Sequence, residues 1–377
     1  MASAIALGRA RSDIDVMSRA GLPLLDFADE AAAALQTAVP FVAACLSTLD
    51  PATAMVSSTA KLGALTGRNE GDILWAQIEY AGDDPTAYTA MLAAGEVSLG
   101  LHDATAGAVE RSPRMTRLLR PRFDFHDEAR ALFTDRTGAW GAFALFRGSD
   151  DSPFSPAEIA FIAAVAPAFT RGFRTGLLAQ QSRQHDAAST GPAVIVVDAH
   201  DRVVQSSPAA EQHLRQLSVA PGMGDPLVSV QALVSAARRV ARGTSDSIPR
   251  VRARRHDGGW LVLHAAPLGG MGDRAGDVVV TIEQARPQEV IDLVAAAFGL
   301  TAREREVVGM VLRGSDTREI AGALHLSPYT VQDHFKSIFE KAGVTSRGEL
   351  VSRVYFDQFV TRSGTELGIG GWQASAP

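Results

Sequence analysis

Residues 300–350 read LTAREREVVGMVLRGSDTREIAGALHLSPYTVQDHFKSIFEKAGVTSRGEL and decide the fold of the C-terminal part of the chain. Capping motifs recur along this stretch as three capping boxes and one serine followed by a first-turn proline, at Thr301, Asp316, Ser346 and Ser327. The spacing predicts a short helix over 317–324, a tight turn, and a longer helix over 328–342. A short helix joined to a longer one in this way is the geometry that fits a major groove.

The longer helix has one apolar and one polar face. Its apolar residues recur at helical spacing and are expected in a core: Val331, Phe335, Ile338, Phe339 and Ala342. The opposite face carries Gln332, Asp333 and Lys336, whose amide, carboxylate and ammonium groups can bond to base edges. Phosphate contacts are expected at Thr330, His334, Lys341 and Arg347. The full set expected at DNA is Thr330, Val331, Gln332, Asp333, His334, Lys336, Lys341 and Arg347.

This stretch resembles the DNA-binding domain of LuxR-type transcriptional regulators. The resemblance rests on Leu300-Thr301, Arg303-Glu304, Glu306-Val307, Gly314, Glu319-Ile320-Ala321, Leu324, Ser327-Pro328, Thr330-Val331, His334, Lys341, Gly343-Val344 and Arg347. It implies an all-α, four-helix domain over 300–360 that binds double-stranded DNA. Gln332 and Asp333 depart from the family, where a lysine and an apolar residue often stand at these positions. The operator sequence therefore cannot be copied from other members.

The charge balance predicts a dimer. The formal net charge is −6, so any basic footprint for DNA must be local. One copy is then expected to bind modestly, and a homodimer on a two-part site would strengthen binding. The last helix, over 347–359, carries more apolar surface than a small bundle can cover. Its expected dimer contacts are Leu350, Val351, Val354 and Tyr355.

Cysteine and charge patterns bear on the compartment. Cys45 is the single cysteine, so neither a disulfide within the chain nor a cysteine metal site can form. We expect a buried, inert thiol there, with a redox switch as the alternative. The first 21 residues are interrupted by charges and do not read as a signal peptide. No apolar run approaches the roughly 18 residues of a membrane helix. The expectation is a cytoplasmic protein without membrane contact.

Residues 22–178 predict a first domain, an α/β sandwich. A helix over 25–38 precedes two hairpins, the first with strands at 41–49 and 54–58, the second at 129–133 and 139–146. A long helix over 156–178, expected to kink near Pro167, follows. The region resembles a GAF domain, most clearly in Trp140-Gly141-Ala142-Phe143-Ala144-Leu145 and in Phe154-Ser155-x-x-Glu158.

Residues 191–285 predict a second domain, of the α+β class. Their order of elements is a strand hairpin at 193–205, helices from Ser207-Pro208 onward, and strands at 250–255, 260–265 and 278–283. This order resembles a PAS fold. A polar linker over 179–190 precedes it, a connecting helix over 286–299 follows, and residues 361–377 are expected to be disordered. Together these parts predict a multidomain α+β protein of 377 residues.

Other candidate residues favour structural roles. Trp75, Trp140 and Trp260 are expected in cores, with pocket walls as the alternative. The histidines show no metal spacing, and a single one cannot argue for haem. The glycine run at 269–272 lacks a phosphate-loop context and is expected in a hairpin loop. No catalytic motif is present, so no cofactor and no enzymatic activity are expected.

The combined expectation is a one-component transcriptional regulator. Its first two domains would sense a small molecule or a partner, because both resembled families act as sensors. That step is an analogy at the level of fold. RNA polymerase is a further expected partner. The alternative is a protein-interaction module, in which the helical unit docks a polymerase-associated protein instead of DNA.

Overall fold

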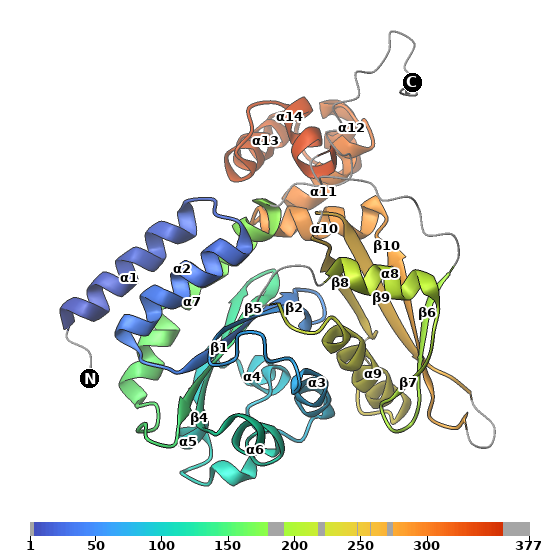
Figure 1. The fold of residues 1–377 in the computed structure, drawn as a ribbon. Helices are drawn as coiled ribbons and strands as arrows, with labels where there is room; N and C mark the ends of the chain where they lie inside the picture. The colour runs from blue at the N-terminus through green and yellow to red at the C-terminus, as the bar shows by residue number, and fades with distance from the viewer. Residues whose placement is uncertain are drawn as a thin grey trace, which may run out of the picture. The chain divides into compact units, whose positions relative to one another are not determined.

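The computed structural model describes residues 4–179, 192–217, 223–246, 248–256, 258–269 and 274–356. The chain divides into two compact units (Figure 1). The first unit holds both β-sheets with the helices around them, and the second holds the C-terminal helices. Most of the expected linker at 179–190, most of the glycine run at 269–272, and the tail at 361–377 lie outside the described residues.

In the described residues, the first sheet has five strands in the order β2-β1-β5-β4-β3, all paired antiparallel. Their bounds are β1 Ala43–Asp50, β2 Met55–Gly63, β3 Ser98–Gly100, β4 Phe125–Asp135 and β5 Gly138–Gly148. Both predicted hairpins are confirmed. The strand predicted at 54–58 continues to Gly63, because its residues pair with β1 as far as Ala43.

Three long helices cover one face of this sheet: α1 (Ala4–Arg19), α2 (Leu24–Ala38) and α7 (Pro156–Ala179). The predictions of α2 and α7 are confirmed, and Pro167 lies inside α7. Sequence reasoning did not predict α1. This helix buries Ala10 and Ile14 in the core that α2 and α7 form, and Arg171 of α7 forms an ion pair with Asp15 of α1. It therefore belongs to this unit.

Shorter elements cover the other face of the first sheet. They are α3 (Asp72–Ala81), α4 (Tyr88–Ala94), α5 (Leu101–Ala104), a 3₁₀ turn (Val109–Arg111), a π-helical turn (Met115–Leu119) and α6 (Arg120–Phe123). A cluster of charged side chains lies beneath them without solvent exposure. In this cluster Arg114 pairs with Glu79, Asp84 and Glu128 at 3.0, 3.2 and 3.1 Å, and Arg130 pairs with Glu79 at 2.8 Å. These buried pairs fix α3 and the π-helical turn to the sheet.

The second sheet repeats the strand order of the first, as β7-β6-β10-β9-β8. Its strands are β6 Ala193–Val197, β7 Val203–Ser206, β8 Arg250–Arg254, β9 Trp260–Pro267 and β10 Val278–Gln284. All five were predicted, as was α8 (Pro208–Leu217). A second helix, α9 (Leu227–Ala241), packs on β9 and β10. Eight of its side chains are buried, and its apolar face supplies much of the core.

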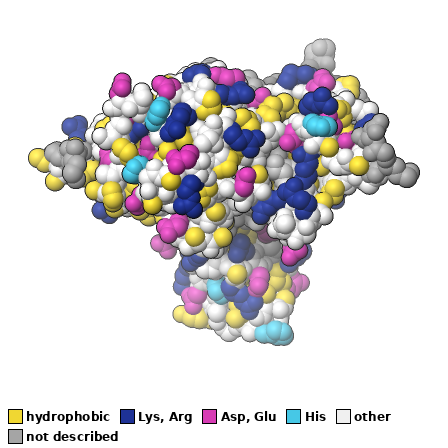
Figure 2. All heavy atoms as spheres, turned by 90° about the horizontal axis from the view of Figure 1, so that it is seen from below, with side chains coloured by type: hydrophobic (Ala, Val, Ile, Leu, Met, Phe, Trp, Pro, Cys, Tyr) yellow, Lys and Arg dark blue, Asp and Glu magenta, His cyan; other side chains and the backbone are white. Residues whose placement is uncertain are grey.

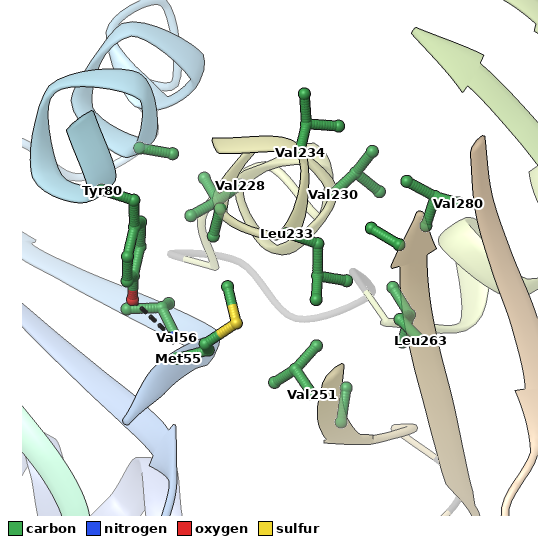
Figure 3. Packing of buried hydrophobic residues seen from close by; sticks show 14 of the residues in the cluster. Met55, Val56, Tyr80, Val228, Val230, Leu233, Val234, Val251, Leu263 and Val280 are labelled. Atoms are coloured by element: carbon green, nitrogen blue, oxygen red, sulfur yellow. Dashed lines mark hydrogen bonds between the residues drawn. The ribbon is translucent and has the colours of Figure 1, made fainter. Parts of the chain in front are cut away.

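Helix α9 also packs against the first sheet region, so the two sheets share a hydrophobic core. Figure 3 shows Val228, Val230 and Leu233 of α9 between two sets of side chains. Met55, Val56 and Tyr80 lie on one side, and Val251, Leu263 and Val280 on the other. A buried ion pair between Asp50 of β1 and Arg252 of β8 joins the sheets directly, with an N–O distance of 2.5 Å. The two predicted sheet domains thus form one compact unit.

The second unit is helical. It comprises α10 (Pro287–Ala297), α11 (Ala302–Leu312), α12 (Thr317–Ala323), α13 (Pro328–Ala342) and α14 (Arg347–Val351), which continues as a π-helical turn (Ser352–Phe356). All of these were predicted. The capping boxes at Thr301 and Asp316 form as expected, and Ser327 and Ser346 cap α13 and α14. In the part of the chain that the structure describes, no helix is both long and apolar enough to cross a membrane.

Candidate nucleic-acid interface

The turn between α12 and α13 is tight. His325 adopts a left-handed conformation with φ 54°, and the Leu326 amide donates to the Ala321 carbonyl at 2.8 Å. The Thr330 amide donates to the Ser327 hydroxyl at 3.1 Å, which starts α13 at Pro328. A non-glycine residue with positive φ is uncommon, and here it reverses the chain within a few residues. The turn fixes the direction in which α13 leaves α12.

Helix α13 has the two faces that its sequence predicts. Val331, Phe335, Ile338 and Ala342 are buried and form the core side of the helix, whereas Phe339, which was also expected in the core, is half-buried. Gln332, Asp333 and Lys336 are exposed on the other side, and Tyr329 is 74 % exposed. Thr330 and His334 are half-buried at the margin between the two faces. The three residues expected to read bases therefore lie together on an accessible surface, whereas Val331 lies inside.

The exposed face carries an ion pair. Lys336 Nζ lies 3.4 Å from Asp333 Oδ1, one helical turn away, and both side chains are more than half exposed. Exposed pairs of this kind contribute roughly 0–1 kcal/mol, so either partner can leave it for a stronger one. The Asp333 carboxylate also balances the charge of Lys336 on this face. This face is thus suited to selective contacts more than to strong general attraction.

Lys341 has a partner within the unit. Its ammonium donates to both carboxylate oxygens of Glu304 on α11, at 2.6 and 2.7 Å. Ser337 donates to the same carboxylate at 2.7 Å, and the Thr301 amide donates to it at 2.6 Å. Burial raises the pKa of the Glu304 carboxyl, but these hydrogen bonds outweigh burial and lower the pKa to about 2. Sequence reasoning identified Glu304 as a capping residue only, because its contacts with α13 span 37 residues of chain.

Arg347 also makes contacts inside the unit. Its guanidinium lies 4.2 Å from the centre of the Phe335 ring, and it donates to the Thr317 hydroxyl at 2.9 Å. It therefore joins α14 to α13 and to the start of α12. Arg318, next to Thr317, is exposed at the same helix N-terminus and was not singled out in the sequence. Its signal is the basic side chain alone, because the amides of Arg318 and Glu319 in this turn already donate to the Asp316 carboxylate.

The residues expected at a dimer interface divide into two groups. Leu350 and Val354 are fully buried inside the unit, so they belong to its core. Val351 and Tyr355 are half-buried and present surface to the outside. The remainder of the predicted helix, at 357–359, lies outside the described residues.

Charge on the molecular surface is mixed. On the face drawn in Figure 2, basic and acidic side chains are interspersed, with no large area of a single sign. This distribution agrees with the net charge of −6.

Comparison with known proteins identifies the helical unit. The family described as "Bacterial regulatory proteins, luxR family" matches residues 299–354. The monoamine regulon transcriptional regulator of Klebsiella aerogenes is 41% identical over a match that covers 19% of this chain and 37% of that protein. The transcriptional regulatory protein DesR of Bacillus subtilis is 39% identical, over 18% of this chain and 34% of its own length. The chain thus spans about a third of the length of these two relatives.

Among solved structures, the Vibrio cholerae VqmA dimer is 16% identical, over 44% of this chain and 82% of that one. Its TM-score of 0.21 is too low to carry an argument about fold or function. The luxR-family match, by contrast, covers α11 to α14, with the helix-turn-helix geometry described above. The C-terminal part of the chain therefore carries a LuxR-type helix-turn-helix domain of the bacterial regulatory proteins.

Proposed function

We propose that this protein is a sequence-specific transcriptional regulator that binds double-stranded DNA through α12 and α13. The observation that carries the proposal is the exposed triad of Gln332, Asp333 and Lys336 on the accessible face of α13, within the luxR-family match. An amide, a carboxylate and an ammonium group can each bond to base edges in the major groove. Thr330, His334 and the exposed Arg318 border this face as contacts for phosphates.

The DNA-bound form in this proposal is a homodimer. The mixed charge on α13 gives a single copy little general attraction to DNA, so two copies on a two-part site are needed for tight binding. Val351 and Tyr355 are the outward members of the expected interface, since Leu350 and Val354 are taken up by the core. Lys341 and Arg347 act chiefly within the domain by holding α13 against its neighbours. RNA polymerase is the proposed partner of the bound dimer.

The first unit is proposed to regulate this DNA binding. We assign its sheets to a GAF-like domain over 22–178 and a PAS-like domain over 191–285, and we expect a small-molecule effector to bind there. Their fusion through α9 supports a joint response, because a change in one sheet region has a packed path to the other. An effector would act by binding two arrangements of the protein with different affinities.

The test is selection of binding sites from random genomic fragments with the full chain, followed by titration of the recovered site. Lys336→Ala should weaken binding by about 1–3 kcal/mol and relax preference at one base position. Arg313→Ala, which removes an exposed arginine at the end of α11, is the matched control. It should weaken binding less, and equally for all sequences.

Recovery of no site would favour the alternative, in which the helical unit docks a polymerase-associated protein. Pull-down with the same Lys336→Ala chain then separates the two functions. A DNA reader keeps its protein contacts in this variant, whereas a docking module that uses the same face of α13 loses them.

A further inference from the structure

A pocket lies within the first unit, where β1 and β2 of the first sheet meet α3. Its cavity volume is about 40 Å³, and the space between the lining side chains reaches about 480 Å³ when the part that opens to solvent is counted. Apolar side chains form most of its wall: Leu65, Trp75, Leu118, Leu119, Phe123 and Phe146. Small-molecule sites are commonly apolar clefts with a few placed polar groups, and the lining of this pocket has that composition. The DNA-binding function proposed above does not use this pocket.

Lys61 brings a buried positive charge to the pocket, but this charge is already neutralised. Its side chain is 3 % exposed and pairs with Asp72. It also donates to the Asn69 side-chain oxygen at 2.8 Å and to the Arg68 carbonyl. An ammonium group has three N–H donors, so all of them are used. A ligand anion would have to break one of these bonds inside an apolar wall, which disfavours charged ligands.

Two hydroxyl groups on the pocket wall can still form hydrogen bonds with a ligand. Ser47 Oγ and Thr59 Oγ1 line the pocket and lie 3.1 Å apart. One hydrogen bond between two hydroxyls leaves one O–H donor and several lone pairs for a third group. The pocket can therefore satisfy a single neutral hydroxyl or carbonyl of a ligand.

Cys45 also lines the pocket, and its chemistry points to reversible binding. Burial raises the pKa of its thiol to about 12. The thiolate is the nucleophilic form, so this thiol stays unreactive near neutral pH. It acts as one more weakly polar part of the wall.

The second sheet region contributes to the wall of the pocket. Val228, in the first turn of α9, is one of its lining residues. The segment before it is held on the pocket wall: the Gly224 amide donates to the Thr59 carbonyl at 2.8 Å, and the Asp225 amide donates to Asp72 Oδ2 at 2.8 Å. Asp72 thus joins Lys61, through one oxygen, to the segment that leads into α9, through the other.

We propose that this pocket binds a small, uncharged, mainly aromatic molecule with one hydroxyl or carbonyl group, and that the bound molecule acts on α9 through residues 223–228. The chemical class follows from the apolar wall, the neutralised Lys61 and the free capacity of Ser47 and Thr59. The connection to α9 follows from Asp72 and Val228, which both line the pocket. Asp72 accepts from the Asp225 amide just before α9, and Val228 lies in the first turn of α9, the helix at the core of the second sheet. The inference rests on the proposed regulatory role of the first unit.

Calorimetric titration of the full chain with 1-naphthol and with 1-naphthoate tests the ligand class. Naphthol should bind at least tenfold more tightly than naphthoate. Thr59→Val keeps the side-chain shape and removes the hydroxyl, so it should weaken naphthol binding about 3- to 10-fold. Thr48→Val is the matched control, because the Thr48 hydroxyl bonds to Ser57 and Ser58 and does not line this pocket. Binding of neither probe, equal binding of both, or equal effects of the two variants would overturn the proposal.

Hydrogen exchange on the same samples tests the path. Naphthol should slow exchange of the Gly224 and Asp225 amides several-fold in the wild-type chain. Naphthol binding without any change at these amides would overturn the coupling to α9. The affinity of the chain for the recovered DNA site is measured in parallel, without naphthol. Its result separates a failed ligand proposal from a failed DNA-binding proposal.

Discussion

Glu304→Gln removes one negative charge from the junction of α11 and α13. In the wild-type domain this carboxylate accepts hydrogen bonds from Lys341, Ser337 and the Thr301 amide while its side chain is 5 % exposed. Glutamine keeps the shape and one oxygen acceptor but loses the charge. The Lys341 ammonium is then left with a weaker partner, and α13 loses part of its attachment to α11.

The pKa of Glu304 sets the scale of this effect. Its value falls from 4.5 to about 2, and each pH unit corresponds to 1.36 kcal/mol. The ionised carboxylate therefore contributes about 3 kcal/mol at most. Because glutamine still accepts one hydrogen bond, we expect a loss of about 2 kcal/mol. Glu306→Gln is the matched control, since Glu306 is 53% exposed in its pair with Arg303 and should contribute less than about 1 kcal/mol.

Native-state hydrogen exchange on the full chain measures this loss locally, in amides of α11 and α13. A loss of about 2 kcal/mol corresponds to a roughly 30-fold decrease in protection, since about 1.4 kcal/mol is tenfold. Glu306→Gln should change protection less than fivefold. Equal protection in wild-type and Glu304→Gln chains would refute the reasoning, as would equal losses in both variants.

The ionisation of Glu304 should also make the stability of the helical unit depend on pH. A lowered folded-state pKa gives stability that is fully present above the unfolded value near 4.5 and is lost as pH falls through about 2. Protection of α11 and α13 in the wild-type chain should therefore decrease between these values. The Glu304→Gln chain should lack this component of the decrease.

Three further predictions concern other contacts. Asp333→Asn should reduce discrimination at one base pair of the recovered site by about 1–3 kcal/mol, measured with single-base variants of that site; a uniform rise in affinity for all sequences would show that Asp333 only repels phosphates. Tyr355→Asp should lower operator affinity and shift the protein toward monomer in sedimentation, while near-wild-type dimerisation would place the interface elsewhere. Asp50→Asn should destabilise the first unit by about 3–5 kcal/mol, because the buried charge of Arg252 loses the ionised carboxylate of Asp50. Denaturation followed by tryptophan fluorescence checks this last change, and the exposed Glu70→Gln serves as its control.

Sequence reasoning succeeded where the signal is local. Helix caps at Thr301, Asp316 and Ser327 predicted the starts of three helices, because a cap depends on residues three or four positions apart. The turn residues at 135–138 likewise predicted the hairpin of β4 and β5. The exposed face of α13 followed from helical periodicity alone. These features need no knowledge of which elements pack together.

Sequence reasoning was weaker where a residue's role depends on a partner far along the chain. Lys341 was assigned to phosphate from its position in the helix-turn-helix pattern, yet it contacts Glu304. Leu350 and Val354 were assigned to a dimer because the last helix has more apolar surface than a small bundle was expected to cover. In the structure both side chains are buried in the core of the unit. Helix α1 was missed because its apolar positions are interrupted by charges, one of which, Asp15, pairs with Arg171. The role of each of these residues depends on contacts with residues far along the chain, which the local sequence does not reveal.

The fusion of the two sheets illustrates this limit most clearly and bears on function. Asp50 and Arg252 are separated by 202 residues, and neither has a local feature that marks it as buried. In sequence, Asp50 reads as a turn residue at the end of β1, and Arg252 as an exposed residue of a charged strand. In the structure they form a buried pair, and α9 packs on both sheets. A ligand bound at the proposed pocket of the first sheet would therefore meet the second sheet across a packed interface, so a signal would not need to pass along the 179–190 segment to reach it.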